Sequence, residues 1–205
     1  MGNNSDNATF DGAELFAECL AQATLVVKQV LPSHYINPTP DAEWDVRDLL
    51  SHMVNLLESV PNVLIGRESA LVDELEDDDS VEVAVVDLAV QWQQATDQAE
   101  AALLDSDLED SVNVQGEQLL VETFLIEIAG DLLIHTWDLG EAIGMPVKFP
   151  TATVSAVLDT VPSAMSESIT SHVLASQSHM PPKNSDPQSR LLALFGRTPT
   201  WRLAS

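Results

Sequence analysis

The sequence is poor in cysteine. Cys19 is the only cysteine among 205 residues, so no intramolecular disulfide can form. A cytoplasmic, reducing environment is therefore expected. Cys19 lies close in sequence to Phe16, Leu20 and Ala23, and this apolar setting favours a small core residue over a nucleophile.

The sequence is also poor in basic residues, with 8 Lys and Arg against 33 Asp and Glu and a formal net charge of -25. A chain this acidic repels phosphate backbones and lacks a basic face for anionic lipids, so neither nucleic acid nor a membrane is expected as a partner. Two interpretations of the acid excess remain. It is either a solvated surface suited to a saline habitat or a set of acids that collects cations.

Long apolar runs are missing as well. No stretch reaches the roughly 18 apolar residues of a membrane-spanning helix, and the N-terminus has no basic region followed by an apolar segment. Apolar residues nevertheless make up 45% of the chain, which is typical of a globular protein. We expect one soluble domain over residues 1–205, with a core at about 11–176 and a tail at 177–205.

The apolar residues recur mainly at helical spacing, which predicts an all-α fold. Five helical segments are expected. They are 11–31, one from Asp45 that Pro61 kinks or ends, 81–103, 119–143, and one opening at 150–151 that Pro162 interrupts or bends. Asp45 is the predicted N-cap of the second segment, with Asp48 in its first turn. Residues 73–80 form an acidic linker.

Two smaller elements are expected beside these helices. Val112 and Val114 alternate with polar residues before Gln115-Gly116, which is a weak signal for a small β-hairpin. Residues 177–189 are rich in Ser, Pro and Asn and indicate a loop. A short apolar helix is predicted at 190–195, closed by Gly196.

The fourth segment carries the most informative pattern. One helical column contains, in order, Phe124, Ile128, Asp131, His135, Leu139 and Ala142. Asp131 and His135 therefore lie on an otherwise apolar stripe, where an unpaired carboxylate is costly. Because they are four residues apart, both can reach one metal ion.

His52 is the best candidate for a third ligand, because it borders the apolar face of the second segment near Leu49 and Leu56. Three protein ligands with one open position are typical of a catalytic metal site. The alternative is a buried hydrogen-bonded pair, Asp131 with His135 or His52, that locks two helices together. The remaining histidines, His34, His172 and His179, are poorer candidates because of their loop positions or their lack of a carboxylate partner.

Three motifs resemble one known family. Trp44–His52 resembles the W-x-V-x-D-L-x-x-H signature of the mycothiol-dependent maleylpyruvate isomerase N-terminal domain family. Asp131–Leu139 is similar to its second signature, an acid four residues before H-x-W-D-L. The ending, Arg190–Arg197 with Pro199 and Trp201, is similar to the tail of an actinobacterial subgroup.

The resemblance implies a DinB-like four-helix bundle with an additional short C-terminal helix. It also implies that His52, Asp131 and His135 bind a divalent metal, with zinc expected and nickel or another ion as alternatives. The well-studied isomerase has Glu at the acid position and this chain has Asp131. Asp is one methylene shorter, so the ion must lie closer to the helix or be bound differently. Asp138, three residues beyond His135, is either a second-shell acceptor that orients an imidazole or part of a helix-to-helix hydrogen bond.

Two functions follow from this resemblance. The first is an isomerase or transferase that uses mycothiol or another low-molecular-weight thiol on a small-molecule substrate. Because no cysteine lies near the proposed site in the sequence, the sulfur must come from that thiol. The second is a non-enzymatic protein that binds a metal or small molecule on the same fold. The sequence leaves the assembly open, including a homodimer.

Overall fold

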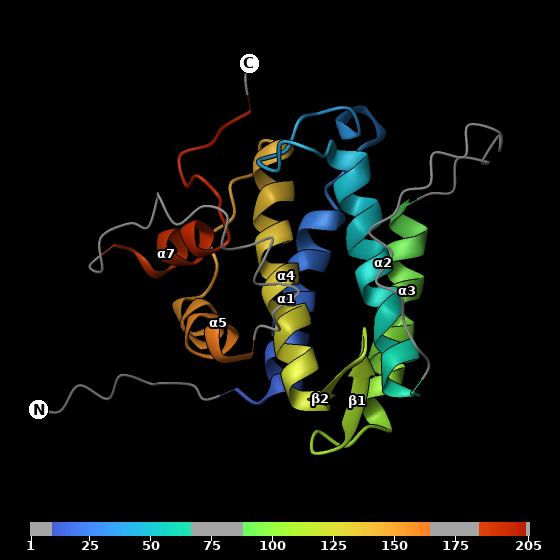
Figure 1. Ribbon diagram of the computed structural model, residues 1–205. Helices are drawn as coiled ribbons and strands as arrows, with labels where there is room; N and C mark the ends of the chain where they lie inside the picture. Colours follow the sequence, from blue (N-terminus) through green and yellow to red (C-terminus); the bar gives the residue numbers. More distant parts are fainter. Residues whose placement is uncertain (1–9, 67–87, 165–184, 204–205) are drawn as a thin grey trace, which may run out of the picture.

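The computed structural model describes residues 10–66, 88–164 and 185–203. Its main helices are α1 (Gly12–Val27), α2 (Val46–Leu64), α3 (Leu88–Leu104) and α4 (Val121–Ala142). These helices run roughly along one direction as a bundle, with α1 beside α4 and α2 beside α3 (Figure 1). The predicted all-α bundle is confirmed.

Shorter elements complete the described fold. A 3-10 helix, η1 (Pro32–His34), lies between α1 and α2, while α5 (Thr151–Ala164) and α7 (Pro187–Leu194) pack on each other beside the bundle (Figure 1). The predicted hairpin is also present, with β1 (Ser111–Val114) antiparallel to β2 (Glu117–Leu120). No helix within the described ranges is long and apolar enough to cross a membrane.

The helix starts follow from local capping. Asp45 caps α2 by accepting from the backbone amide of Asp48, whose side chain in turn accepts from the Asp45 amide. This reciprocal pair satisfies two donors that a helix start otherwise leaves free, and it confirms the predicted N-cap. Pro61 lies inside the last turn of α2, and the helix continues past it to Leu64.

Three predicted boundaries are wrong. α1 ends at Val27, four residues before the predicted end, where the amides of Gln29 and Val30 bond to carbonyls three residues back instead of four. Leu31 is then extended (φ -109°, ψ 154°), as expected for the residue preceding a proline. α4 begins at Val121, since Leu119 and Leu120 belong to the second strand of the hairpin. α7 begins at Pro187, because the Asp186 side chain caps it by accepting from the Ser189 amide.

Other predictions fall outside the described residues. The acidic linker 73–80, the start of the third helix at 81–87, and His172 and His179 all lie in ranges that the structure does not describe.

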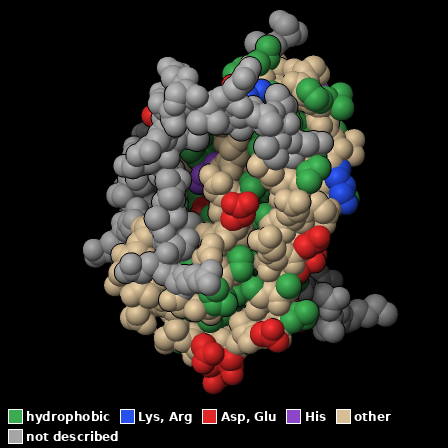
Figure 2. All heavy atoms as spheres, turned by 90° about the vertical axis from the view of Figure 1, so that its right-hand side faces the viewer, with side chains coloured by type: hydrophobic (Ala, Val, Ile, Leu, Met, Phe, Trp, Pro, Cys, Tyr) green, Lys and Arg blue, Asp and Glu red, His purple; other side chains and the backbone are tan. Residues whose placement is uncertain are grey.

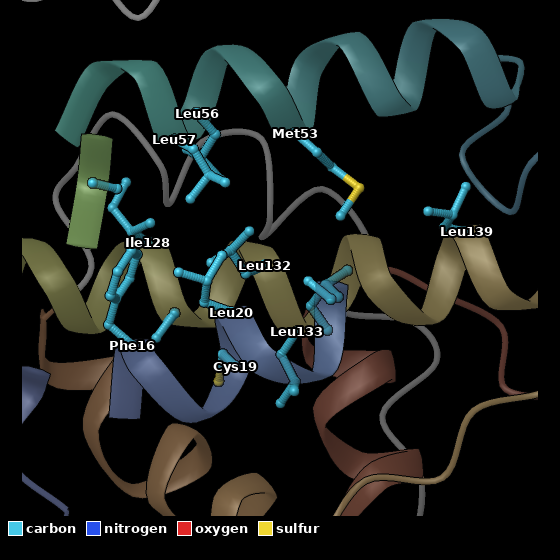
Figure 3. Packing of buried hydrophobic residues seen from close by; sticks show 14 of the residues in the cluster. Phe16, Cys19, Leu20, Met53, Leu56, Leu57, Ile128, Leu132, Leu133 and Leu139 are labelled. Atoms are coloured by element: carbon cyan, nitrogen blue, oxygen red, sulfur yellow. The ribbon is translucent and has the colours of Figure 1, made fainter. Parts of the chain in front are cut away.

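The core lies between α1, α2 and α4 (Figure 3). Phe16 and Leu20 of α1 and Ile128 and Leu132 of α4 meet there, each at most 3% exposed. Cys19 of α1 is also fully buried in the hydrophobic core, and burial raises the pKa of its thiol. The prediction that Cys19 is a core residue rather than a nucleophile is therefore confirmed by its position.

The surface view reflects the charge imbalance. On the face shown in Figure 2, red Asp and Glu side chains are spread widely, while blue Lys and Arg side chains are few. Some histidine surface, in purple, is visible from outside on the same face.

Candidate functional site

The two predicted histidine ligands come together between α2 and α4. His52 is partly buried on α2, and His135 is 8% exposed on α4. Their ring centroids lie 4.9 Å apart at an interplanar angle of 77°. Two residues separated by more than eighty positions in sequence therefore share one site, as the motif spacing predicted.

Trp44 covers this histidine pair. Its ring lies 4.5 Å from that of His52 and 5.7 Å from that of His135, tilted by 37° and 45°. In the sequence Trp44 was noted only as the first residue of the Trp44–His52 motif, with no role in the site. The Trp44 ring therefore covers one side of the two imidazoles with an apolar surface.

The loop that carries Trp44 is held by polar contacts. The Thr39 hydroxyl accepts from the amide of Asp41 at 3.1 Å and lies 2.9 Å from the Trp44 carbonyl, to which it can donate. The Asn37 side chain donates to the carbonyl of Ala142 at 2.9 Å, which ties this loop to the end of α4. Trp44 is thus fixed by its own loop and by α4, directly before the cap of α2.

His52 is held in its neutral form. Burial, with smaller contributions from the nearby His135 and Arg197, lowers its pKa to about 3. A neutral imidazole is the form that binds a metal ion. His52 is therefore ready to act as a ligand at any pH near neutrality.

Asp131 lies one turn before His135 on α4 and is partly exposed. Burial raises the pKa of its carboxyl group, although His135 and Arg197 act in the opposite direction. A carboxyl group in this setting gains from a neighbouring cation.

Within the described ranges, no three His, Cys, Asp or Glu side chains are arranged as a group that could hold a metal ion. The ligand set His52, Asp131 and His135 therefore stays a prediction. The donor chemistry of the site nevertheless suits a cation. His135 Nδ1 is buried and has no hydrogen-bond partner in the part of the chain that the structure describes. An unsatisfied buried donor or acceptor is uncommon in native proteins and costs stability.

Asp138 approaches that nitrogen from the same helix. Its Oδ2 atom lies 3.4 Å from His135 Nδ1, and its side chain is fully buried. The main partner of Asp138, however, is Arg197 in the C-terminal tail. Arg197 Nε lies 3.1 and 3.0 Å from Oδ1 and Oδ2 of Asp138, and Nη2 lies 2.9 Å from Oδ2.

Arg197 also reaches the loop before α2. Its Nη2 atom donates to Oδ2 of Asp41 at 2.9 Å. Burial alone would lower the pKa of the guanidinium, but the attraction of the Asp138 and Asp41 carboxylates outweighs this effect. The pKa is therefore raised, and Arg197 stays positively charged. One arginine thus joins the tail, the helix of His135 and the loop of Trp44.

Sequence reasoning missed Asp41 and Arg197 as members of the site. Arg197 appeared only as the last letter of the tail motif, and its partners lie 59 and 156 positions away. An arginine directly after an apolar helix, in a chain with 8 basic residues, was the one available signal. That signal does not indicate which acidic residue the arginine pairs with.

Residues 16–140 match the family described as the mycothiol maleylpyruvate isomerase N-terminal domain. The chain belongs to this family. The match includes His52, Asp131, His135 and Asp138 but ends before the tail that carries Arg197. No curated protein and no solved structure gives a significant match to the chain.

Proposed function

We propose that this family member is a thiol-dependent isomerase or transferase for a small molecule, with a divalent metal held by His52, Asp131 and His135. The observation that carries the proposal is the close pair of imidazoles, one from α2 and one from α4, with centroids 4.9 Å apart. Neutral imidazole nitrogens and a carboxylate together suit zinc, and nickel or another divalent ion is an alternative.

The burial of the site supports this function. The lowered pKa of His52 favours the neutral imidazole that a metal ion requires, and burial raises the pKa of Asp131 although His135 and Arg197 oppose this. Three protein ligands leave a position for an exchangeable group. A divalent ion bound there would supply Lewis acidity and lower the pKa of a coordinated thiol.

The sulfur has to come from outside the chain. Cys19 is fully buried in the hydrophobic core, so it does not reach a substrate. Mycothiol is the thiol indicated by the family, and other low-molecular-weight thiols share its chemistry. In this role Trp44 packs over the imidazoles and limits the access of water to them.

Cobalt substitution tests the proposal directly. The host is the variant Cys19→Ala, which removes the chain's own sulfur without placing a polar group in the core. Co²⁺ is bound to this host, and mycothiol, bacillithiol or glutathione is then added. Thiolate ligation produces an intense near-ultraviolet charge-transfer band, which we expect with at least one thiol.

The matched control is Cys19→Ala combined with His135→Ala, which should give no such band. If Co²⁺ binds to the host but none of the three thiols produces the band, thiol activation is wrong and a non-enzymatic binding function replaces it. If the host binds no Co²⁺, the metal site itself is wrong.

A further inference from the structure

The tail of the chain places one buried cation beside the candidate site. Arg197 follows α7, and its side chain is 16% exposed. Its guanidinium meets both oxygens of Asp138, which is fully buried, in a forked arrangement. A forked arginine fixes the orientation of a carboxylate as well as neutralising it.

The donors of Arg197 are largely used within the protein. Nε bonds to Asp138, Nη2 bonds to Asp138 and Asp41, and Nη1 lies 3.4 Å from the carbonyl of Phe195. A substrate anion would have to displace at least one of these contacts. The geometry therefore favours a role inside the protein over direct substrate binding.

The second neighbour of the Asp138 side chain is His135. Oδ2 of Asp138, the oxygen that also accepts from Arg197 Nη2, lies 3.4 Å from His135 Nδ1. That nitrogen has no hydrogen-bond partner among the described residues, so a small shift completes a hydrogen bond with Asp138. When Nδ1 carries the proton, Nε2 is the ring nitrogen with a free lone pair.

We propose that Arg197 is a positioning residue that holds the Asp138 carboxylate against His135 Nδ1, so that His135 offers Nε2 as its ligand atom. The part of this proposal that concerns a ligand rests on the proposed function, whereas the choice of tautomer does not. The tail beyond the family match thus takes part in the site, through Asp138 on one side and the Asp41 loop that carries Trp44 on the other.

The chain provides a matched control on the same tail. Arg202 lies 3.3 Å from Glu141, a buried carboxyl group one turn beyond Asp138 on α4. Arg202→Gln removes the same charge from the same tail and deprives another buried acid of α4 of its partner. The structure gives Glu141 no contact with His135 among the described residues, so Arg202→Gln leaves the neighbours of His135 in place. Any effect of this variant on His135 therefore reports a general weakening of the tail.

The experiment reads the tautomer of His135 in metal-free, ¹⁵N-labelled protein by long-range ¹H–¹⁵N NMR, with His135→Gln used to assign the signal. The parent and Arg202→Gln should show the Nδ1–H form. Arg197→Gln should show a mixture of both tautomers. Arg197→Lys keeps the charge but loses the fork, so it should lie between them.

Zinc affinity, measured by competition with a chelator, is the second readout. Arg197→Gln should bind zinc about 10–100-fold more weakly than the parent, as expected when a partner of a metal-ligating histidine is disturbed. Arg197→Lys should be intermediate and Arg202→Gln close to the parent. If Arg197→Gln does not fold, Arg197→Lys decides the question.

The outcomes separate the two proposals. If the parent binds no zinc, the proposed function fails, and the tautomer measurement still tests Arg197. If the parent binds zinc and both Arg197 variants match it in tautomer and affinity, the positioning role is wrong. An Arg202→Gln variant as strongly affected as Arg197→Gln also contradicts it, because the tail would then act only as a general support.

Discussion

The two halves of α4 are buried in different ways. From Phe124 to Leu133 its buried residues are apolar apart from Glu127, and Ile128 and Leu132 face α1 and α2 in Figure 3. The proposed ligand Asp131, which is partly exposed, also lies in this half. From His135 to Glu141 the same helix buries an imidazole and two carboxyl groups. Apolar contacts stabilise the first half, whereas the second half depends on two tail arginines to offset its buried charges.

Apart from Asp131, the groups assigned to the site on this helix lie in its second half, and the apolar residues of the first half stabilise the bundle. Burying polar groups costs free energy unless they are paired, and replacing such a pair by apolar residues is often neutral or stabilising. The polar half is therefore a poor way to stabilise a bundle. Its arrangement around the histidine pair indicates that it serves the site instead.

The largest expected effect is on the apolar half. Phe124→Ala removes a side chain that is 1% exposed, so the free energy of unfolding should fall by about 3–5 kcal/mol. Zinc bound per folded chain should stay as in the parent. Urea unfolding and metal analysis check this. Val90→Ala, at a position 49% exposed on α3, is the control and should change stability by less than about 0.5 kcal/mol. A loss of metal from folded Phe124→Ala would contradict the separation.

On the polar half, Asp138→Leu should lower the free energy of unfolding by up to about 3–5 kcal/mol, because it leaves the Arg197 charge with Asp41 alone. Combining it with Arg197→Met removes both charges and should recover most of that loss, while zinc affinity stays weak. Thermal unfolding and chelator competition measure the two quantities. A double variant that regains zinc affinity together with stability would show that the pair serves stability only.

A smaller effect concerns pH. In metal-free protein the pKa of His52 is lowered to about 3, whereas it is near ~6.5 in the unfolded chain. The unfolded state therefore binds the proton first as pH falls. The contribution of His52 to stability is present above about pH 6.5 and is lost progressively toward pH 3.

Asp131 and Glu141 have raised pKa values and act with the opposite sign, so the test compares the parent with His52→Gln, which shares them. Urea unfolding between about pH 7.5 and pH 5, around the pKa of an unfolded histidine, should show a steeper loss of stability in the parent. Equal slopes in the two proteins would mean that His52 is not held neutral.

The smallest expected effect is that of salt, which does not distinguish the two halves. At a net charge of -25, self-repulsion destabilises the folded chain and added salt screens it. The midpoint of thermal unfolding should rise modestly in sodium chloride. An unchanged or lower midpoint would favour the other interpretation, in which the acids bind cations specifically.

The sequence predicted the local features of this molecule well. The spacing predicted one column of six residues down α4, and five of them are buried: Phe124, Ile128, His135, Leu139 and Ala142. The sixth, Asp131, is partly exposed rather than directed into the core. Asp45 was identified as a cap because capping depends on neighbouring residues. The start of α4 was misplaced at Leu119, because a short apolar run suits a strand and a helix equally.

The candidate site was predictable only in part. The family motifs placed His52 and His135 together, and the structure confirms that their rings meet. The partners of Arg197 were not predictable, because periodicity describes one element at a time and Asp138 and Asp41 belong to others. The role of Trp44 was missed for the same reason, since it depends on how a loop folds back over two helices.

Metal analysis of the purified protein tests the central claim most directly. After saturation with zinc and removal of the excess, the parent should hold roughly one ion per chain, as expected for a three-ligand site. His52→Ala, Asp131→Ala and His135→Ala should each fall well below that value, while His34→Ala, at a histidine whose Nδ1 accepts from the Leu31 amide, should match the parent. If all three ligand variants hold as much zinc as the parent, His52, Asp131 and His135 do not form the metal site.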